Sequence, residues 1–279
     1  FQDDSIDMIL TAIGVDDTYR LLPYLFEQDA LKKVAKQKIF LGFSDTTMNH
    51  LMLHKVGIQS FYGQAFLSDV CELSAEMLPY TKSYFEELLT TGRIKEIRPS
   101  EIWYQEREDF SEKGLGVSTP SFPNQGFELL KGSAQFSGPI LGGCLESMYD
   151  CFDSSLYADS VQLTQKYKLF PTLEDWSGKI LLLETSEERP SVELYRKMIQ
   201  ALKQYGIFDV VSGVLVGKSQ NEIHYEEYKA VLLEELQDKE LSIVYNINVG
   251  HATPRCIVPF GVHAQVDVDA QVIRFDYTN

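Results

Sequence analysis

The sequence predicts an α/β protein with parallel sheets, and two observations carry this prediction. Short apolar runs typical of buried strands recur along the 279 residues, and most are followed by apolar positions at helical spacing. Strands that alternate with helices normally lie parallel, because each helix returns the chain to the start of the next strand. The last part of the chain alternates shorter strand-like pieces, so we expect a β-rich C-terminal α/β region.

The N-terminal part predicts three strands, each followed by a helix. The predicted strands are residues 7–13, 38–43 and 60–62. The predicted helices are residues 17–26, 45–56 and 72–91. A short strand at residues 94–97 closes this part, which we interpret as an N-terminal parallel α/β domain covering residues 1–98.

The alternation of predicted strands and helices ends after residue 98, where a stretch rich in Pro, Gly, Ser and aromatic residues begins. We interpret residues 99–139 as a linker and mobile loop, and residues 140–279 as a C-terminal domain. This domain is predicted to contain a strand, an amphipathic helix and a second strand at residues 179–184, 191–205 and 210–216. Further strands are expected at residues 242–246, 256–259 and 271–275.

Composition excludes several classes of function. The chain has 25 Lys and Arg against 41 Asp and Glu, a net charge of −16, and no basic stretch beside aromatic residues, which argues against nucleic-acid binding. Its apolar runs are too short to cross a membrane. The first residues lack the order of a signal peptide, so we expect a cytoplasmic location. The four cysteines show no CxxC spacing, which favours free thiols over a metal site.

Ser44 is the first candidate for chemistry. It follows the predicted strand at residues 38–43 and precedes a helix, so its hydroxyl is presented at a sharp turn, while the amide of Asp45 points to where an oxyanion would form. A lipase-type elbow needs glycine two residues after the serine, and Thr46 stands there instead. On local evidence alone, Ser44 is better explained as a helix N-cap than as a nucleophile.

Two further residues follow buried strands. Glu184 ends the predicted strand at residues 179–184, where a carboxylate in apolar surroundings needs a partner and could orient a histidine, but taken alone it is better explained by a structural role at the turn. His251 lies in a Gly-His step after another strand. His50 and His54 are one helical turn apart, but no third ligand accompanies them and no metal site is expected. A metal-free amide hydrolase needs a nucleophile, a base and a carboxylate, which these three residues would supply.

Five segments resemble motifs of one family, in the family's order along the chain. They are residues 12–24 (AIG through RLLPY), 41–47 (LGFSDTT), 141–146 (LGGCLE), 182–190 (LLETSEERP) and 250–251 (GH). The chain thereby resembles the serine peptidases that comprise the LD-carboxypeptidases of murein recycling and the microcin C immunity hydrolases. The resemblance implies that Ser44, Glu184 and His251 form a catalytic triad. It also implies an N-terminal domain like that of class I glutamine amidotransferases, a site between the domains, a homodimer and no cofactor.

The resemblance also narrows the substrate. The ETSEERPS and GGCLE runs and the long insert favour the immunity-type subgroup, which cleaves the bond between an aminoacyl group and a nucleotide-like moiety. The alternative is release of D-alanine from murein tetrapeptides. Phe127 is the candidate to stack on a nucleobase, where the family commonly has tryptophan, and a ring folded onto the core is the other explanation. Trp103 and Gly14 are further candidates for substrate contact.

Two departures from the family bear on activity. The family generally has Gly-Gly where this chain has Gly14-Val15, and the Val15 amide is expected to line the oxyanion hole together with that of Asp45. The family also has further strand-helix units before this segment, so we expect an unpaired edge on the first sheet. A noncatalytic binding protein on the same scaffold therefore stays open. A glutamine amidotransferase-like domain is disfavoured because Cys144, the nearest candidate nucleophile, does not stand at an elbow.

Overall fold

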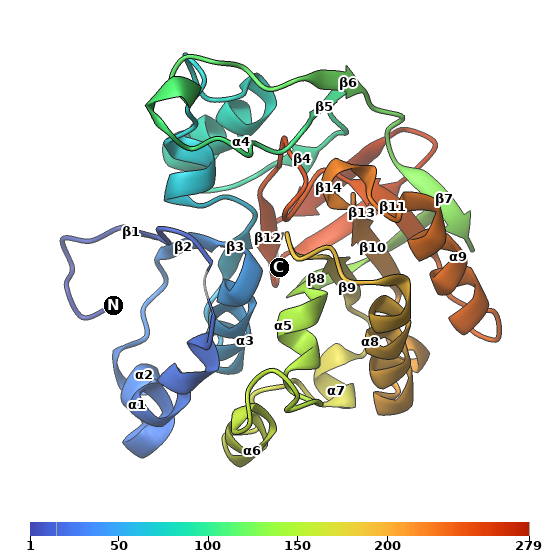
Figure 1. Cartoon of the computed structure of the whole chain (residues 1–279). Coiled ribbons are helices and arrows are strands. Elements are labelled where there is room, and N and C mark those ends of the chain that lie inside the picture. Colours follow the sequence, from blue (N-terminus) through green and yellow to red (C-terminus); the bar gives the residue numbers. More distant parts are fainter. Residues whose placement is uncertain (15, 279) are drawn as a thin grey trace.

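The computed structural model describes residues 1–14 and 16–278, and in it the chain folds into two main sheets with helices packed against them (Figure 1). The smaller sheet has the strand order β1-β2-β3-β12. Its strands are β1 (Met8–Leu10), β2 (Ile39–Gly42), β3 (Ser60–Tyr62) and β12 (Val258–Phe260). The first three are parallel, and β12 pairs antiparallel with β3. The end of the chain thus completes the sheet that its beginning starts.

The larger sheet has eight strands in the order β4-β14-β13-β8-β9-β10-β11-β7. Its strands are β4 (Glu96–Ile97), β7 (Glu128–Lys131), β8 (Gln135–Cys144), β9 (Ile180–Glu184), β10 (Gly213–Gly217), β11 (Ile243–Ile247), β13 (His263–Asp267) and β14 (Val272–Asp276). The four central strands β8 to β11 are parallel, and the outer ones are antiparallel. A separate hairpin joins β5 (Ile102–Tyr104) to β6 (Ser121–Pro123).

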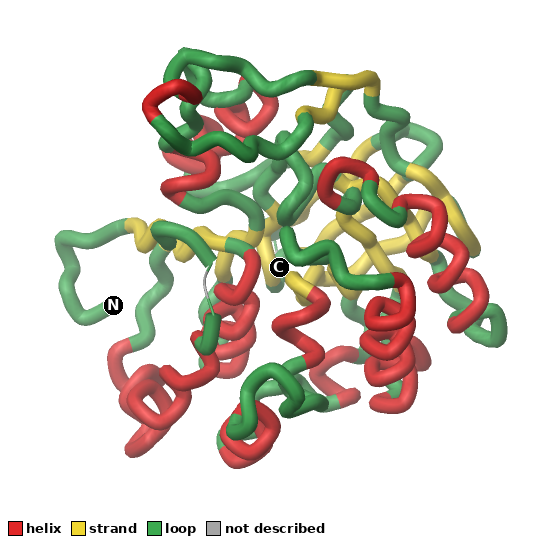
Figure 2. The backbone as a smooth tube through the Cα atoms, in the orientation of Figure 1, coloured by secondary structure: helices red, strands yellow, loops and turns green. Residues whose placement is uncertain are grey.

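The helices lie on more than one side of the two sheets, most of them below the strands in the view of Figure 2 and others above or to the right. They are α1 (Leu22–Phe26), α2 (Ala30–Val34), α3 (Thr47–Lys55), α4 (Pro79–Thr91), α5 (Leu145–Tyr149), α6 (Ser160–Lys166), α7 (Leu173–Trp176), α8 (Val192–Tyr205) and α9 (Tyr225–Glu235). The predicted apolar face of α8 is buried, including Tyr195, Met198, Ile199 and Leu202. Every residue of β9, β10 and β11 is buried too, as expected for parallel strands covered on both faces.

The predicted α/β class, with a parallel sheet and a β-rich C-terminal region, is confirmed. The likeness to glutamine amidotransferases remains a prediction. The helix expected from residue 72 begins only at Pro79, because Leu78 is extended, as residues before proline usually are, and proline suits the first helical turn. No helix in the described part of the chain is long and apolar enough to span a bilayer.

The segment expected to be a linker holds more structure than predicted. It contains β5, β6 and β7 and the start of β8, although Figure 2 draws most of residues 105–120 as loop. The β8 strand was missed because glycines interrupt it. A Cβ at Gly142 would stand 1.9 Å from the carbonyl oxygen of Leu182 in β9, so only glycine lets these two strands approach so closely.

Candidate active site

Ser44 stands in a strained turn at the carboxyl end of β2. Its φ of +66° is a left-handed conformation that costs a residue with a side chain about 1–2 kcal/mol. The turn is held from both sides, because the Ser44 amide donates to the Tyr62 hydroxyl at 3.1 Å and the Thr47 hydroxyl donates to the Ser44 carbonyl at 2.7 Å. The chain therefore presents Ser44 on a tight strand-to-helix elbow even without the second glycine of the lipase motif.

The loop after β1 lies directly against this elbow. A Cβ at Gly14 would stand 2.3 Å from the Ser44 Cβ and 2.9 Å from its Oγ. Only a residue without a side chain fits this approach, which places Gly14 beside the candidate nucleophile. Val15, predicted to help line the oxyanion hole, lies outside the described residues.

The Asp45 side chain ties the elbow to the segment that follows Gly14. Its carboxylate accepts a hydrogen bond from the Thr18 amide at 2.8 Å, at the start of a short 3₁₀ turn. Burial raises the pKa of the Asp45 carboxyl, and the bond from Thr18 partly offsets this effect. The carboxylate therefore has a structural partner, while the oxyanion role predicted for the backbone amide of Asp45 stays a prediction.

Glu184 and His251 form a buried pair. The Glu184 Oε2 lies 2.7 Å from His251 Nδ1 and accepts the His251 backbone amide at 3.1 Å, and the Tyr62 hydroxyl donates to Oε1 at 2.5 Å. Glu184 is 1% exposed. Three donors thus satisfy the carboxylate, which is the condition for keeping a charge inside a protein.

Glycines make room for this carboxylate. A Cβ at Gly250 would stand 2.2 Å from Glu184 Oε2, and one at Gly217 would stand 2.7 Å from the Glu184 Cβ. Gly250 also has a φ of +77°. The Gly-His step of the sequence therefore serves two purposes, because it turns the chain and lets the imidazole reach the carboxylate.

The His251 ring lies next to the elbow but is not bonded to Ser44. It packs edge-on against Phe43, the residue before Ser44, with ring centroids 5.0 Å apart. Its Nε2 is 2.8 Å from Oε2 of Glu187, and no hydrogen bond between Ser44 and His251 occurs in the described structure. Burial alone lowers the pKa of His251, but Glu184 and Glu187 outweigh it and raise this pKa to about 10. The hydrogen bond from His251 in turn lowers the pKa of Glu187 to about 2.

Two residues of this site were missed in the sequence, Tyr62 and Glu187. Tyr62 connects Ser44 to Glu184, because its hydroxyl accepts a hydrogen bond from the Ser44 amide and donates one to the Glu184 carboxylate. Burial raises its pKa well above the usual range, so it stays a neutral donor. Its position at the carboxyl end of β3, next to β2 in a parallel sheet, was the available signal. Glu187 lies within the ETSEERPS run and gave no separate signal.

The loop that carries His251 is fixed by the segment around β5. The Tyr104 amide donates to the Thr253 carbonyl at 2.8 Å, and the Thr253 hydroxyl donates to Glu106 at 2.8 Å. Asn248 accepts from the Ser100 amide at 2.9 Å on the other side of the histidine. His251 is therefore positioned by residues that the sequence placed in a linker.

The predicted substrate-contacting aromatic residues are both buried. Trp103 is 9% exposed, stacks on Phe122 at 4.6 Å and has the Lys218 Nζ 5.2 Å from its ring centre. Phe127 is 4% exposed and belongs to the core, where its backbone is bonded to the Gln271 side chain in both directions. The position of Phe127 matches the alternative explanation, a ring folded onto the core, and such a ring has no free face for a nucleobase.

Among the described residues, the cysteines and acidic side chains form no second candidate centre. All four cysteines are free, and burial raises the pKa of the Cys144 thiol well above its usual range, which disfavours a thiolate nucleophile. No group of three or more His, Cys, Asp or Glu side chains in residues 1–14 and 16–278 is arranged to hold a metal.

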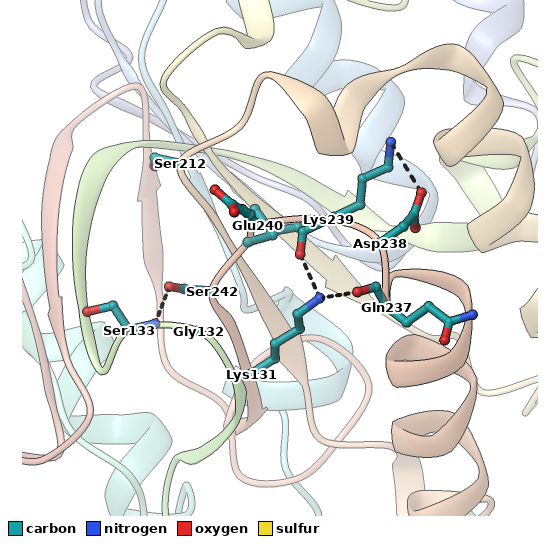
Figure 3. Close-up of a pocket in the computed structure, with 10 residues that line it drawn as sticks. Lys131, Gly132, Ser133, Ser212, Gln237, Asp238, Lys239, Glu240 and Ser242 are labelled. Carbon is teal, nitrogen blue, oxygen red and sulfur yellow. Dashed lines mark hydrogen bonds and ion pairs between the residues drawn. The ribbon is translucent and has the colours of Figure 1, made fainter.

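A depression of about 620 Å³ elsewhere on the molecule has a structural explanation (Figure 3). It lies at the amino ends of β10 and β11, whereas Glu184 and His251 follow the carboxyl ends of their strands. Lys131 reaches across it and donates to the carbonyls of Leu236, Gln237 and Lys239 at the end of α9. A lysine that caps a helix C-terminus stabilises the helix and is no sign of catalysis.

Comparisons with known proteins identify the family to which the chain belongs. Family models described as the LD-carboxypeptidase N-terminal and C-terminal domains match residues 1–63 and 137–266. The crystal structure of an MccF-like protein from Streptococcus pneumoniae in complex with AMP is 66% identical, with a TM-score of 0.98, and the match covers 100% of this chain and 81% of that one.

The microcin C7 self-immunity protein MccF of Escherichia coli is 26% identical in an alignment of 274 positions that covers 95% of this chain and 72% of MccF. A structure of MccF in complex with aspartyl sulfamoyl adenosine matches at 25% identity with a TM-score of 0.77, covering 98% of this chain and 76% of that one. The chain therefore belongs to the LD-carboxypeptidase family of serine peptidases, S66, and its relatives include MccF and MccF-like proteins.

Proposed function

We propose that this protein is a serine-type amide hydrolase of the MccF kind, with Ser44 as nucleophile, His251 as base and Glu184 as the carboxylate that orients the base. The observation that carries the proposal is the buried contact of 2.7 Å between Glu184 and His251, which Tyr62 links to the strained turn of Ser44. A carboxylate on Nδ1 keeps the proton there and leaves Nε2 to accept one.

The reaction follows from these positions. When Nε2 is neutral and free of Glu187, Ser44 Oγ attacks the substrate carbonyl carbon and its proton passes to Nε2. The oxyanion is stabilised by backbone amides at the elbow, for which we propose that of Asp45. Nε2 then gives the proton to the leaving nitrogen as the C–N bond breaks. Water hydrolyses the resulting ester by the same route, with His251 again as base.

We propose an aminoacyl-nucleotide as the substrate. The support comes from the relatives, because the 66% identical protein binds AMP and MccF binds aspartyl sulfamoyl adenosine. A murein L,D-tetrapeptide is the second candidate, since both family models carry the name of the LD-carboxypeptidases. The homodimer and the cytoplasmic location implied by the family resemblance belong to the same proposal.

Parallel hydrolysis assays test this function. Aspartyl sulfamoyl adenosine and a murein L,D-tetrapeptide are incubated with the parent protein and with Ser44→Ala, and released aspartate or D-alanine is measured by mass spectrometry. We expect aspartate release that falls at least about 10³-fold in Ser44→Ala. Ser83→Ala, at an exposed position in α4, is the matched control and should match the parent.

Each other outcome has a definite meaning. Full turnover by Ser44→Ala would refute the assignment of the nucleophile. Release of D-alanine alone would identify the murein L,D-tetrapeptide, instead of the aminoacyl-nucleotide, as the substrate. A folded parent that binds AMP but cleaves neither compound would identify a noncatalytic binding protein.

A further inference from the structure

Glu187 contacts Nε2 of His251, the nitrogen that the proposed reaction needs. Its Oε2 lies 2.8 Å from Nε2, while Glu184 holds Nδ1 on the other side of the ring. Under the proposed mechanism Nε2 must take the proton of Ser44, so the contact with Glu187 has to break before the reaction. One carboxylate is enough to orient the imidazole, and the second therefore needs a different explanation.

The backbone around Glu187 is fixed while its side chain is free to move. Glu146 accepts hydrogen bonds from the Ser186 amide at 2.9 Å and the Ser186 hydroxyl at 2.7 Å, and Arg189 donates to Gln220 at 2.9 Å. The Glu187 side chain itself is 56% exposed. Because the side chain is largely exposed, a change of rotamer can move the carboxylate away from the imidazole.

We propose that Glu187 binds the free α-ammonium group of the substrate's aminoacyl residue, and that this contact releases Nε2 of His251. The inference rests on the proposed function, because the α-ammonium of an aminoacyl group lies one carbon from the carbonyl that Ser44 attacks. The carboxylate exchanges its charge-assisted hydrogen bond from His251 for one from the ammonium ion, and His251, left with one carboxylate, gives its Nε2 proton to solvent water and becomes neutral. An acylated amine offers no such charge, so Glu187 stays on the base.

The surrounding charges favour a cation in this place. Arg255 lies nearby, with its guanidinium 4.8 Å from the centre of the Phe43 ring, but it is paired with Asp69 at 3.0 Å. The next residue, Glu188, is exposed and has no hydrogen bond or ion pair through its carboxylate within the described structure. Glu188 therefore provides a matched control of equal charge, one position away.

The test compares aspartyl sulfamoyl adenosine with its N-acetylated form. For the parent protein and for Glu188→Gln, we expect kcat/KM to favour the free amine by roughly 10- to 100-fold, the range of a charged hydrogen bond. For Glu187→Gln the preference should fall to within about threefold, as expected when the charged partner is gone. Thermal unfolding checks that the exposed substitution leaves the fold intact.

Two results would overturn the proposal. In one, Glu187→Gln keeps the parent's preference for the free amine. In the other, Glu187→Gln raises kcat/KM equally for the free and the N-acetylated compound, which would mean that Glu187 only blocks Nε2 of His251 and does not recognise the amine. Binding of the two compounds to Ser44→Ala, measured by calorimetry, gives the same comparison without turnover. Loss of activity in Ser44→Ala with an unchanged preference in Glu187→Gln would leave the proposed function standing and this inference refuted.

Discussion

The two halves of the site differ in how completely they are formed. Glu184 and His251 in the C-terminal part are joined by direct hydrogen bonds and shielded from solvent. Ser44 in the N-terminal part stands in a strained turn, but Glu187 instead of Ser44 contacts His251. The contrast indicates that the orientation of His251 is built into the fold, whereas a contact between His251 and Ser44 depends on the position of the exposed Glu187 side chain.

Energetics explain this division. A buried carboxylate without partners costs several kcal/mol, so the hydrogen bonds to Glu184 must form together with the fold. The φ of +66° at Ser44 costs about 1–2 kcal/mol and persists because Tyr62 and Thr47 hold the turn. Glu187 is bound by neither constraint, since its side chain remains 56% exposed.

The largest effect is expected from Glu184→Gln, which disrupts the hydrogen-bonded pair of Glu184 and His251. The amide keeps the volume of the carboxylate but removes its charge, so His251 is no longer held as the tautomer that accepts a proton at Nε2. We expect kcat to fall about 10³- to 10⁴-fold with the fold retained. Glu193→Gln, exposed on α8, should match the parent. A Glu184→Gln protein within tenfold of the parent would show that the pair is structural.

Gly14→Ala tests the other half of the site, the strained turn that carries Ser44. The added methyl group would stand 2.3 Å from the Ser44 Cβ, so the elbow or the loop must shift. We expect a loss of about 10²-fold in kcat, comparable with the loss of one oxyanion-stabilising group. Gly57→Ala is the control, because a Cβ there meets open space and its φ of +77° adds only strain. Equal kcat for both variants would remove Gly14 from the site.

Tyr62→Phe tests the link between the halves. The substitution removes a donor to Glu184 and the acceptor of the Ser44 amide. We expect the free energy of unfolding to fall by about 1–3 kcal/mol, because a buried charge loses a partner, and kcat to fall roughly tenfold. Tyr24→Phe, on an exposed ring, should change neither quantity. An unaltered kcat in a destabilised Tyr62→Phe protein would reduce Tyr62 to a packing role.

The smallest predicted effect concerns pH. Glu184 and Glu187 raise the pKa of His251 to about 10, with Arg255 beyond Phe43 as the nearby cation, and a general base works only when neutral. The kcat/KM of the free enzyme should therefore rise with pH into the alkaline range. Glu187→Gln removes one negative charge, lowers the pKa of His251 and moves this rise to lower pH by about one unit. A rise at the same pH in both proteins would contradict the contact.

The sequence predicted which residues lie at the ends of strands better than it predicted the contacts between those residues. Ser44 and Glu184 were singled out because each follows an apolar run, and they do stand at the ends of β2 and β9. The contact between Glu184 and His251 was implied only by the family resemblance. Tyr62 was not predictable in the same way, because its role depends on how β3 pairs with β2 and on where the two sheets meet.

Long-range pairing explains the other differences. The strand β12 joins the smaller sheet from about 200 residues away along the chain, and no local pattern records such a partner. The glycines of β8 weaken its strand signal for the same reason that they are needed, because Gly143 lies where a Cβ would stand 2.4 Å from the Thr47 hydroxyl. Phe127 looked like a loop residue because the strand that follows it, β7, is short and half-exposed.

Covalent labelling with a fluorophosphonate tests most directly whether His251 activates Ser44. The probe is applied to the parent, to His251→Ala and to Ser44→Ala, each shown to be folded, and the modified residue is located by mass spectrometry. We predict labelling at Ser44 in the parent, at least about 10³-fold slower labelling in His251→Ala and none in Ser44→Ala. A folded parent that is not labelled, or labelling at Ser44 that is undiminished in His251→Ala, would contradict the assignment.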